Sequence, residues 1–168
     1  MKHYIGIDPG SKGYISVLNA DGGCVATLPI EDSTDQDTAS FIQRYGDGAL
    51  AIMEDVHAMP GQGVASTFNF GRNVGFLVGI LVAFKIPYVL VTPQRWQKAM
   101  WISADHVTAT TRDKKGNVKK SIMPKHTSIK AATRLFPNVD LKKNDRCKTA
   151  HDGKCDSLLI ALYGKRNF

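Results

Sequence analysis

Residues 4–8 read YIGID, an apolar run that ends in a carboxylate, and Pro9 and Gly10 follow it directly. A run of this length that is stopped by Pro-Gly is typical of a short buried strand. The sequence therefore predicts that Asp8 lies at a strand end, where a rigid scaffold can direct its oxygens toward a metal ion.

Two further segments carry carboxylates. Residues 49–53, ALAIM, form a second strand-like run that ends in Glu54 and Asp55. Alternation along a strand puts these two side chains on opposite faces of the sheet, so Glu54 and Asp55 compete as the ligand from this strand. Asp152 and Asp156 open an apolar helical pattern. For Asp152 a helix cap and a metal ligand are equally open, because Asp is also preferred at helix N-termini.

The composition is typical of a globular protein, with 168 residues of which 43% are hydrophobic. We expect a single domain over residues 1–168. Three cysteines make no disulfide framework, which fits a reducing compartment. No signal peptide is visible, and the apolar run at residues 74–84 is far shorter than the ~20 residues that span a bilayer. We therefore expect a cytoplasmic protein with no membrane segment.

The positive charge is concentrated in one part of the sequence. The net charge is +7, but residues 112–154 hold 13 Lys and Arg against 4 Asp and Glu, a local net of +9. This segregation favours a polyanion-binding region over an ordinary solvated surface. Trp96 and Trp101 flank the region and could either stack on bases or pack in the core. The candidate phosphate contacts are Lys98, Lys114, Lys115, Lys119, Lys120 and Lys125.

The hydrophobic pattern predicts three strands, a helix, a strand, a helix, a further strand and then helices. This order indicates a mixed α/β sheet with helices on both faces. Residues 103–120 are polar, rich in Lys and Thr and without a clear period, so we expect a mobile basic loop there. The main helices are expected at about 38–45, 65–84, 124–136 and 152–163.

Three glycines stand four residues apart in the second of these helices, at Gly71, Gly75 and Gly79. Residues at this spacing share one helix face, and each glycine costs ~1 kcal/mol relative to alanine in a helix interior. Close packing against the sheet and close approach to a second subunit both explain such a face. The sequence leaves the two explanations open.

Three motifs in this order resemble the RuvC family of Holliday junction resolvases, within the ribonuclease H-like fold. They are IGIDPGS at residues 5–11, MEDV at residues 53–56 with its glycine-spaced helix, and DSLLIA at residues 156–161. The sequence around HDGK, residues 151–154, looks most like phage-type members. The resemblance implies an endonuclease of DNA recombination and repair, which acts as a homodimer on four-way and branched DNA. If phage-encoded, it would act in the cytoplasm of the bacterial host.

The resemblance also implies the catalytic residues, which would hold the metal: Asp8, Glu54, Asp152 and Asp156. The family spaces the last two carboxylates three residues apart and this chain four, but both spacings share a helix face. His151 could contribute instead, and His57 occupies the position of the family's aromatic wedge. An all-carboxylate set suits Mg²⁺, with Mn²⁺ as a substitute, and a pair of such ions can activate water and stabilise the leaving oxygen.

Other functions are compatible with parts of this pattern. A related ribonuclease H-like nuclease would cut RNA–DNA hybrids, and a noncatalytic protein would bind branched DNA without cutting it. An actin-like sugar kinase or ATPase could use residues 5–13 as a phosphate loop. That class needs two such lobes, and 168 residues supply only one.

Overall fold

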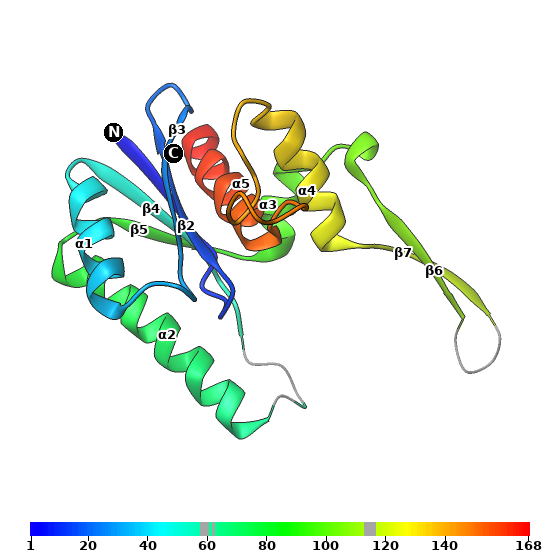
Figure 1. Ribbon diagram of the computed structural model, residues 1–168, viewed down its shortest axis with the longest axis horizontal. Helices are drawn as coiled ribbons and strands as arrows, with labels where there is room; N and C mark the ends of the chain where they lie inside the picture. Colours follow the sequence, from blue (N-terminus) through cyan, green and yellow to red (C-terminus); the bar gives the residue numbers. More distant parts are fainter. Residues whose placement is uncertain (58–60, 62, 113–116) are drawn as a thin grey trace.

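The computed structural model describes residues 1–57, 61, 63–112 and 117–168. Its centre is a five-stranded mixed sheet in the order β3-β2-β1-β4-β5 (Figure 1). The strands are β1 (His3–Ile7), β2 (Tyr14–Asn19), β3 (Cys24–Pro29), β4 (Ala49–Glu54) and β5 (Tyr88–Val91). The helices are α1 (Asp35–Gly46), α2 (Val64–Ala83), α3 (Pro93–Met100), α4 (Pro124–Leu135) and α5 (Asp152–Asn167), with a 3₁₀ turn at Ser103–Asp105. No helix in the described part of the chain is both long and apolar enough to cross a membrane.

The register of the sheet brings two strand ends together. β1 runs antiparallel to β2 and parallel to β4, with Ile7 opposite Met53. β5 continues the parallel part, with Val91 opposite Glu54. Because parallel strands end at the same edge of a sheet, the residues that follow β1 and β4 lie side by side.

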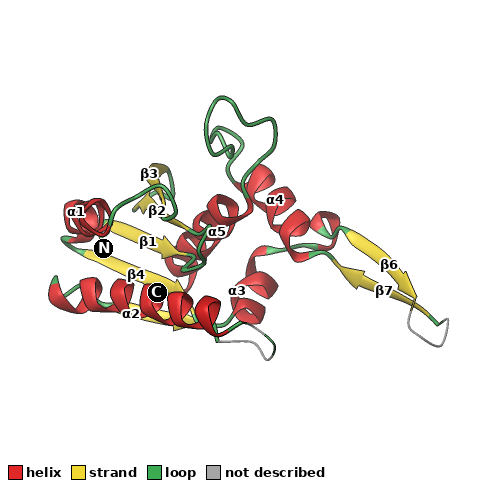
Figure 2. Ribbon diagram, turned by 60° about the horizontal axis from the view of Figure 1, so that its bottom comes forward, coloured by secondary structure: helices red, strands yellow, loops and turns green. Residues whose placement is uncertain are grey.

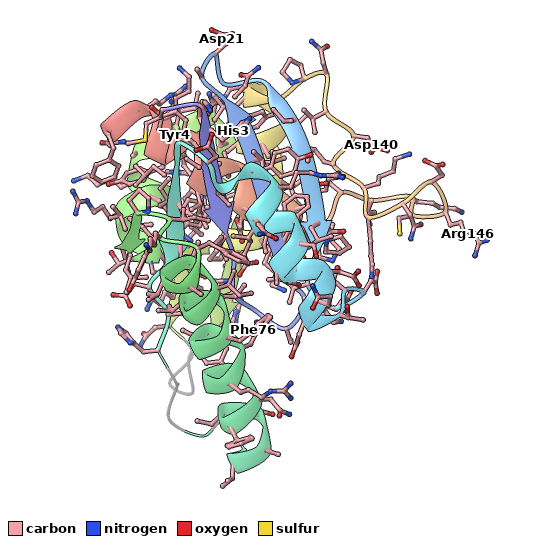
Figure 3. All side chains as sticks on the ribbon, turned by 90° about the vertical axis from the view of Figure 1, so that its left-hand side faces the viewer. His3, Tyr4, Asp21, Phe76, Asp140 and Arg146 are labelled. Carbon is pink, nitrogen blue, oxygen red and sulfur yellow. The ribbon has the colours of Figure 1, made fainter. Side chains whose placement is uncertain are left out.

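Helices cover both faces of the sheet, as the sequence predicts. α1 and α2 pack on one face, where Ile5 and Ile7 of β1 meet Leu77 and Leu81 of α2. α5 lies on the other face, with α3 and α4 beside it (Figures 1 and 2). Figure 3 looks onto the first of these layers, with α1 and α2 running side by side in front of the strands. The alternation of inward side chains along each strand gives each face its own core.

The contact between α5 and the sheet is unusually close at one point. A Cβ on Gly6 would lie 2.0 Å from the carbonyl oxygen of Ser157 and 2.4 Å from the amide nitrogen of Ala161. Only glycine therefore fits where β1 passes under this helix. Beside it, the hydroxyls of Ser16 and Ser157 share a buried hydrogen bond of 2.6 Å. These contacts fix the start of α5 against the end of β1.

The segment expected to be a loop has regular structure instead. After the 3₁₀ turn, β6 (Thr108–Arg112) and β7 (Val118–Ile122) pair antiparallel and form a hairpin that projects away from the sheet (Figure 2). Its strands carry mostly Thr, Lys and Ser, so they lack the apolar alternation by which strands are recognised in a sequence. Lys114 and Lys115 lie outside the described residues.

The glycine face of α2 does not pack on the sheet. A Cβ at Gly71, Gly75 or Gly79 would have no neighbour within 4 Å in the part of the chain that the structure describes. α2 instead contacts the core through Leu77, Ile80 and Leu81. The explanation by close sheet packing is therefore wrong, and the face is open in the protomer.

Candidate active site

Three carboxylates converge at the edge where β1 and β4 end. Asp8 follows the last residue of β1, Glu54 is the last residue of β4, and Asp156 lies in the second turn of α5. A Cβ on Gly153 would lie 3.0 Å from Oδ2 of Asp8 and 2.6 Å from the carbonyl oxygen of Lys12. The first turn of α5 thus rests directly on the loop that carries Asp8.

That loop is a tight and well-bonded turn. Oδ1 of Asp8 accepts a hydrogen bond of 3.1 Å from the amide of Gly10. The amide of Gly13 donates to the carbonyl oxygen of Gly10 at 2.9 Å, and a Cβ on Gly13 would collide with the Asp8 carbonyl oxygen at 2.0 Å. From α2, Nδ2 of Asn73 donates to the carbonyl oxygen of Pro9 at 2.7 Å. The orientation of the Asp8 carboxylate is therefore set by neighbours on both sides.

Glu54 has a hydrogen-bond partner from the helix that follows β5, the neighbouring strand. Nε1 of Trp96, on α3, donates to Oε1 of Glu54 at 2.8 Å. Oδ2 of Asp55 instead lies 3.8 Å from Nε2 of His57. Glu54 interacts electrostatically with Asp8 and Asp156. Of the two neighbouring carboxylates, Glu54 is the one that joins the cluster.

The two aspartates of α5 differ in their surroundings. Asp156 lies beside Ser128, but among the described residues neither its buried Oδ1 nor the Ser128 hydroxyl forms a hydrogen bond of normal geometry. Asp152 is paired with Lys125 of α4, whose Nζ lies 2.7 Å from its Oδ2. The N-cap of α5 is His151 and not Asp152, the residue that the sequence offered as a possible cap. Asp152 is therefore the first residue of the helix, and Lys125 balances its charge.

Burial and crowding oppose the charged forms of three of these groups. Burial raises the pKa of Asp8 to about 7, helped by the charges of Glu54 and Asp152 and opposed by the Gly10 hydrogen bond. Burial also raises the pKa of Asp156 well above its usual value, with smaller contributions from the neighbouring carboxylates. The pKa of Glu54 is raised by burial and partly restored by Trp96. For Asp152 burial acts in the same direction, but Lys125 outweighs it and the pKa is lowered.

The donor set fits a hard divalent cation. As the side chains stand, no group of three or more His, Cys, Asp or Glu in the described residues is close enough to hold a metal ion. The carboxylates nevertheless interact electrostatically with one another, and Oδ1 of Asp156 has no hydrogen bond of normal geometry from any described residue. A cation bound among them would relieve both conditions, and oxygen-only ligands suit Mg²⁺.

Comparison with solved structures identifies the fold. The chain superposes on Thermus thermophilus RuvC in complex with a Holliday junction substrate with a TM-score of 0.57, at 12% identity, covering 97% of this chain and 92% of that one. A second Thermus thermophilus RuvC structure gives 0.54 at 15% identity, covering 95% and 90%. The chain has the fold of RuvC. No family model matches the sequence, and no curated protein is similar to it.

The basic residues expected to meet DNA are spread around this RuvC-like fold. Lys125 lies at the carboxylate cluster through its pair with Asp152. Lys98 is exposed on α3, and Lys119 and Lys120 are exposed on β7 of the hairpin. They come from three separate elements, so the sequence alone could not show how they are arranged.

Trp96 and Trp101 do not form a stacking platform. Trp96 is completely buried, which excludes it from base stacking, and the half-buried Trp101 packs edge-on against it with ring centroids 6.1 Å apart. The contact of Trp96 with Glu54 was not predicted from the sequence. The sequence contains no signal for it, because the contact depends on which strand neighbours β4.

Proposed function

We propose that the chain is a metal-dependent endonuclease that resolves Holliday junctions and other branched DNA. The observation that carries this proposal is the convergence of Asp8, Glu54 and Asp156 from β1, β4 and α5 on a fold shared with RuvC. Each carboxylate comes from a different rigid element, which is the support that a hydrolytic site needs.

Asp8, Glu54 and Asp156 would hold the metal, and Asp152 would complete the set of catalytic carboxylates. Mg²⁺, or Mn²⁺ in its place, would supply charge neutralisation at the scissile phosphate and a hydroxide at neutral pH. The protein's own part is to fix the three carboxylates and to keep a buried lone pair at Asp156 free. Lys125 keeps the charge of Asp152 balanced until a cation or phosphate arrives.

DNA binding would follow the basic segment at residues 112–154, whose net charge is +9. Lysines that neutralise phosphates release condensed counter-ions, and this release drives binding without reading sequence. The contacts we propose are those expected from the sequence: Lys98, Lys114, Lys115, Lys119, Lys120 and Lys125.

A homodimer would place two such sites on one four-way junction. Two symmetric nicks require two active sites related by a two-fold axis, which is also the commonest symmetry of protein dimers. The open glycine face of α2 is the surface we assign to this contact, with exposed Phe68 and Val82 on the same helix. In a phage-infected bacterium such an enzyme would act in the host cytoplasm during recombination or repair.

The test is incubation of the protein with a labelled synthetic four-way junction, a linear duplex and an RNA–DNA hybrid, each with and without Mg²⁺. We expect paired, Mg²⁺-dependent nicks in the junction alone.

Asp8→Asn and Asp156→Asn should abolish cutting and preserve binding, since they remove a negative charge and leave the basic surface intact. Binding without cutting by the wild type would indicate a noncatalytic protein, and cutting of the hybrid would indicate a different ribonuclease H-like nuclease. Near-normal nicking by either Asn variant would refute the carboxylate mechanism.

A further inference from the structure

We propose that Trp96 is a positioning residue, whose indole N–H holds the carboxylate of Glu54 in the orientation that binds metal. The inference rests on the proposed function and adds to it a residue outside the carboxylate set. It starts from one contact, in which Nε1 of Trp96 donates to Oε1 of Glu54 at 2.8 Å. No other hydrogen bond to the Glu54 side chain occurs among the described residues.

The sheet fixes the indole relative to Glu54. Val91 of β5 stands opposite Glu54, and the amide of Asp55 donates to the Val91 carbonyl oxygen at 2.7 Å. α3 begins immediately afterwards with Pro93, a residue suited to the first helical position. Trp96 lies in the first turn of that helix, so its backbone is tied through β5 to the end of β4.

The core holds the ring itself in place. Trp96 is 0% exposed and is the largest of the fully buried side chains in the described residues. It packs edge-on against Trp101 and belongs to the same core cluster as Leu158 of α5. A side chain with two rotatable bonds and no free surface cannot follow a swinging carboxylate, so the carboxylate must adopt the position that the N–H offers.

An indole N–H is chemically suited to this task. It is a donor only and carries no charge, so it neither competes for the cation nor repels it, as a lysine or arginine would. It occupies one lone pair of Oε1, and no hydrogen bond to Oε2 of Glu54 occurs among the described residues. Partners of this kind, which orient a ligand without touching the metal, typically change metal affinity or activity by about 10- to 100-fold when removed.

A purely structural role predicts a different result, and Trp101 provides the control. The Nε1 of Trp101 is buried, and no residue that the structure describes accepts a hydrogen bond from it. Changing Trp101 to phenylalanine therefore removes an indole from the same cluster without removing a hydrogen bond. The two tryptophans are also the only ones in the sequence, so a Trp101→Phe background leaves Trp96 as the single tryptophan.

The experiment replaces Trp96 in that background by benzothienylalanine, in which a sulfur takes the place of the indole N–H and the ring volume is kept. Trp96→Phe is the second variant, and Glu54→Gln marks the loss of the ligand itself. Mn²⁺ binding to the DNA-free protein is measured by calorimetry, together with thermal unfolding, junction binding without metal and the Mg²⁺ dependence of cutting.

We expect the analogue at Trp96 to weaken Mn²⁺ binding by about 10-fold or more and to raise the Mg²⁺ concentration needed for half-maximal cutting. Metal-free junction binding and the unfolding temperature should stay as in Trp101→Phe, which should itself bind Mn²⁺ like the wild type. Unchanged Mn²⁺ affinity and Mg²⁺ dependence in the analogue would overturn this inference alone. A wild-type chain that binds no Mn²⁺ at all would overturn the proposed function instead.

Discussion

Asp8, Glu54 and Asp156 lie where the fold disfavours their charged forms. Burial is the largest cause in each case, and it raises the pKa of Asp8 to about 7 from 3.8. A carboxyl whose pKa is higher in the folded chain takes up a proton on folding between the two values. The free energy of unfolding therefore falls as the pH rises through that interval.

The first prediction concerns this pH dependence in the metal-free protein. In EDTA, the stability should decrease as the pH rises from about 4 to about 7, the interval between the unfolded and folded pKa of Asp8. At pH 8, Asp8→Asn should be more stable than the wild type by ~1 kcal/mol or more, because one pKa unit corresponds to about 1.4 kcal/mol. Urea unfolding followed by circular dichroism measures both.

The control for this prediction is Asp21→Asn, an exposed carboxylate on the turn after β2. It should leave the pH dependence as it is. Carboxylates with a lowered pKa, such as Asp105, act in the opposite sense but only below pH ~4. A wild-type stability that rises between pH 4 and 7 would contradict the assignment of Asp8 to a buried, crowded site.

Some parts of the site could be predicted from single residues and some could not. Asp8 and Glu54 each close an apolar run, and the parallel pairing of β1 and β4 then brings them together. Trp96 and Ser128 could not be found this way. One is an ordinary core tryptophan in the sequence and the other a serine in a polar helix, and only the packing of α3 and α4 gives them their neighbours.

Among the elements, the β6–β7 hairpin has a base that is held by hydrogen bonds and strands that are exposed. Arg134 of α4 forms two hydrogen bonds to the buried Asp105, from Nε at 3.0 Å and from Nη2 at 2.6 Å. The amide of Met123 donates to the carbonyl oxygen of Val107 at 2.7 Å and closes the base of the hairpin. A two-stranded ribbon is marginally stable in water by itself. The contacts at its base mean that α4, the helix that also carries Lys125, sets the direction of the β6–β7 hairpin.

The second prediction is that the hairpin contributes to binding through charge. The change is Lys114, Lys115, Lys119 and Lys120 together to Gln, which should weaken junction binding and lower the salt slope by up to ~4, about one for each lost phosphate contact. Junction affinity measured over a range of salt concentrations gives the slope. Lys2 and Lys85 lie near Gly48, at the end of the sheet opposite the carboxylates. The variant in which both are changed to Gln is the control and should keep the wild-type slope. An unchanged slope in the fourfold variant would mean that the hairpin does not reach DNA.

At the scale of the whole molecule, the open face of α2 allows a test that separates the protomer from its assembly. A Cβ at Gly75 would meet no neighbour within 4 Å among the described residues of the protomer, and leucine there removes a glycine from a helix interior. The third prediction is that Gly75→Leu keeps or raises the unfolding temperature of the protomer but weakens the homodimer by about 10-fold or more, since overpacking commonly costs ~1–3 kcal/mol. Sedimentation at several micromolar concentrations measures the dimer.

Ser40→Leu is the matched control, because it adds the same side chain at an exposed position of α1. It should leave the sedimentation unchanged. If the wild type sediments as a monomer and still cuts both strands of the junction, the dimer proposal is wrong. If Gly75→Leu remains a dimer of wild-type affinity, the interface lies elsewhere.

Only part of the overall architecture could be predicted from the sequence. The number and order of the main strands and helices follow from local patterns, and the mixed α/β class follows from their order. The strand order β3-β2-β1-β4-β5 depends on contacts between distant segments, which no local pattern encodes. The hairpin was missed for a related reason, since its strands bury little and pair only with each other.

The seat of α5 on β1 also has a consequence for how the protein is made. Asp8 directly follows β1 and Asp156 lies in α5, so most of the chain separates them in the sequence. Because Gly6 and Ser157 meet backbone to backbone, the first strand stays uncovered on one face until that helix has been synthesised. Contacts between such distant segments are slow to form, because they close a long loop of chain. A nascent chain in which α5 has not yet formed would therefore lack an assembled set of carboxylates.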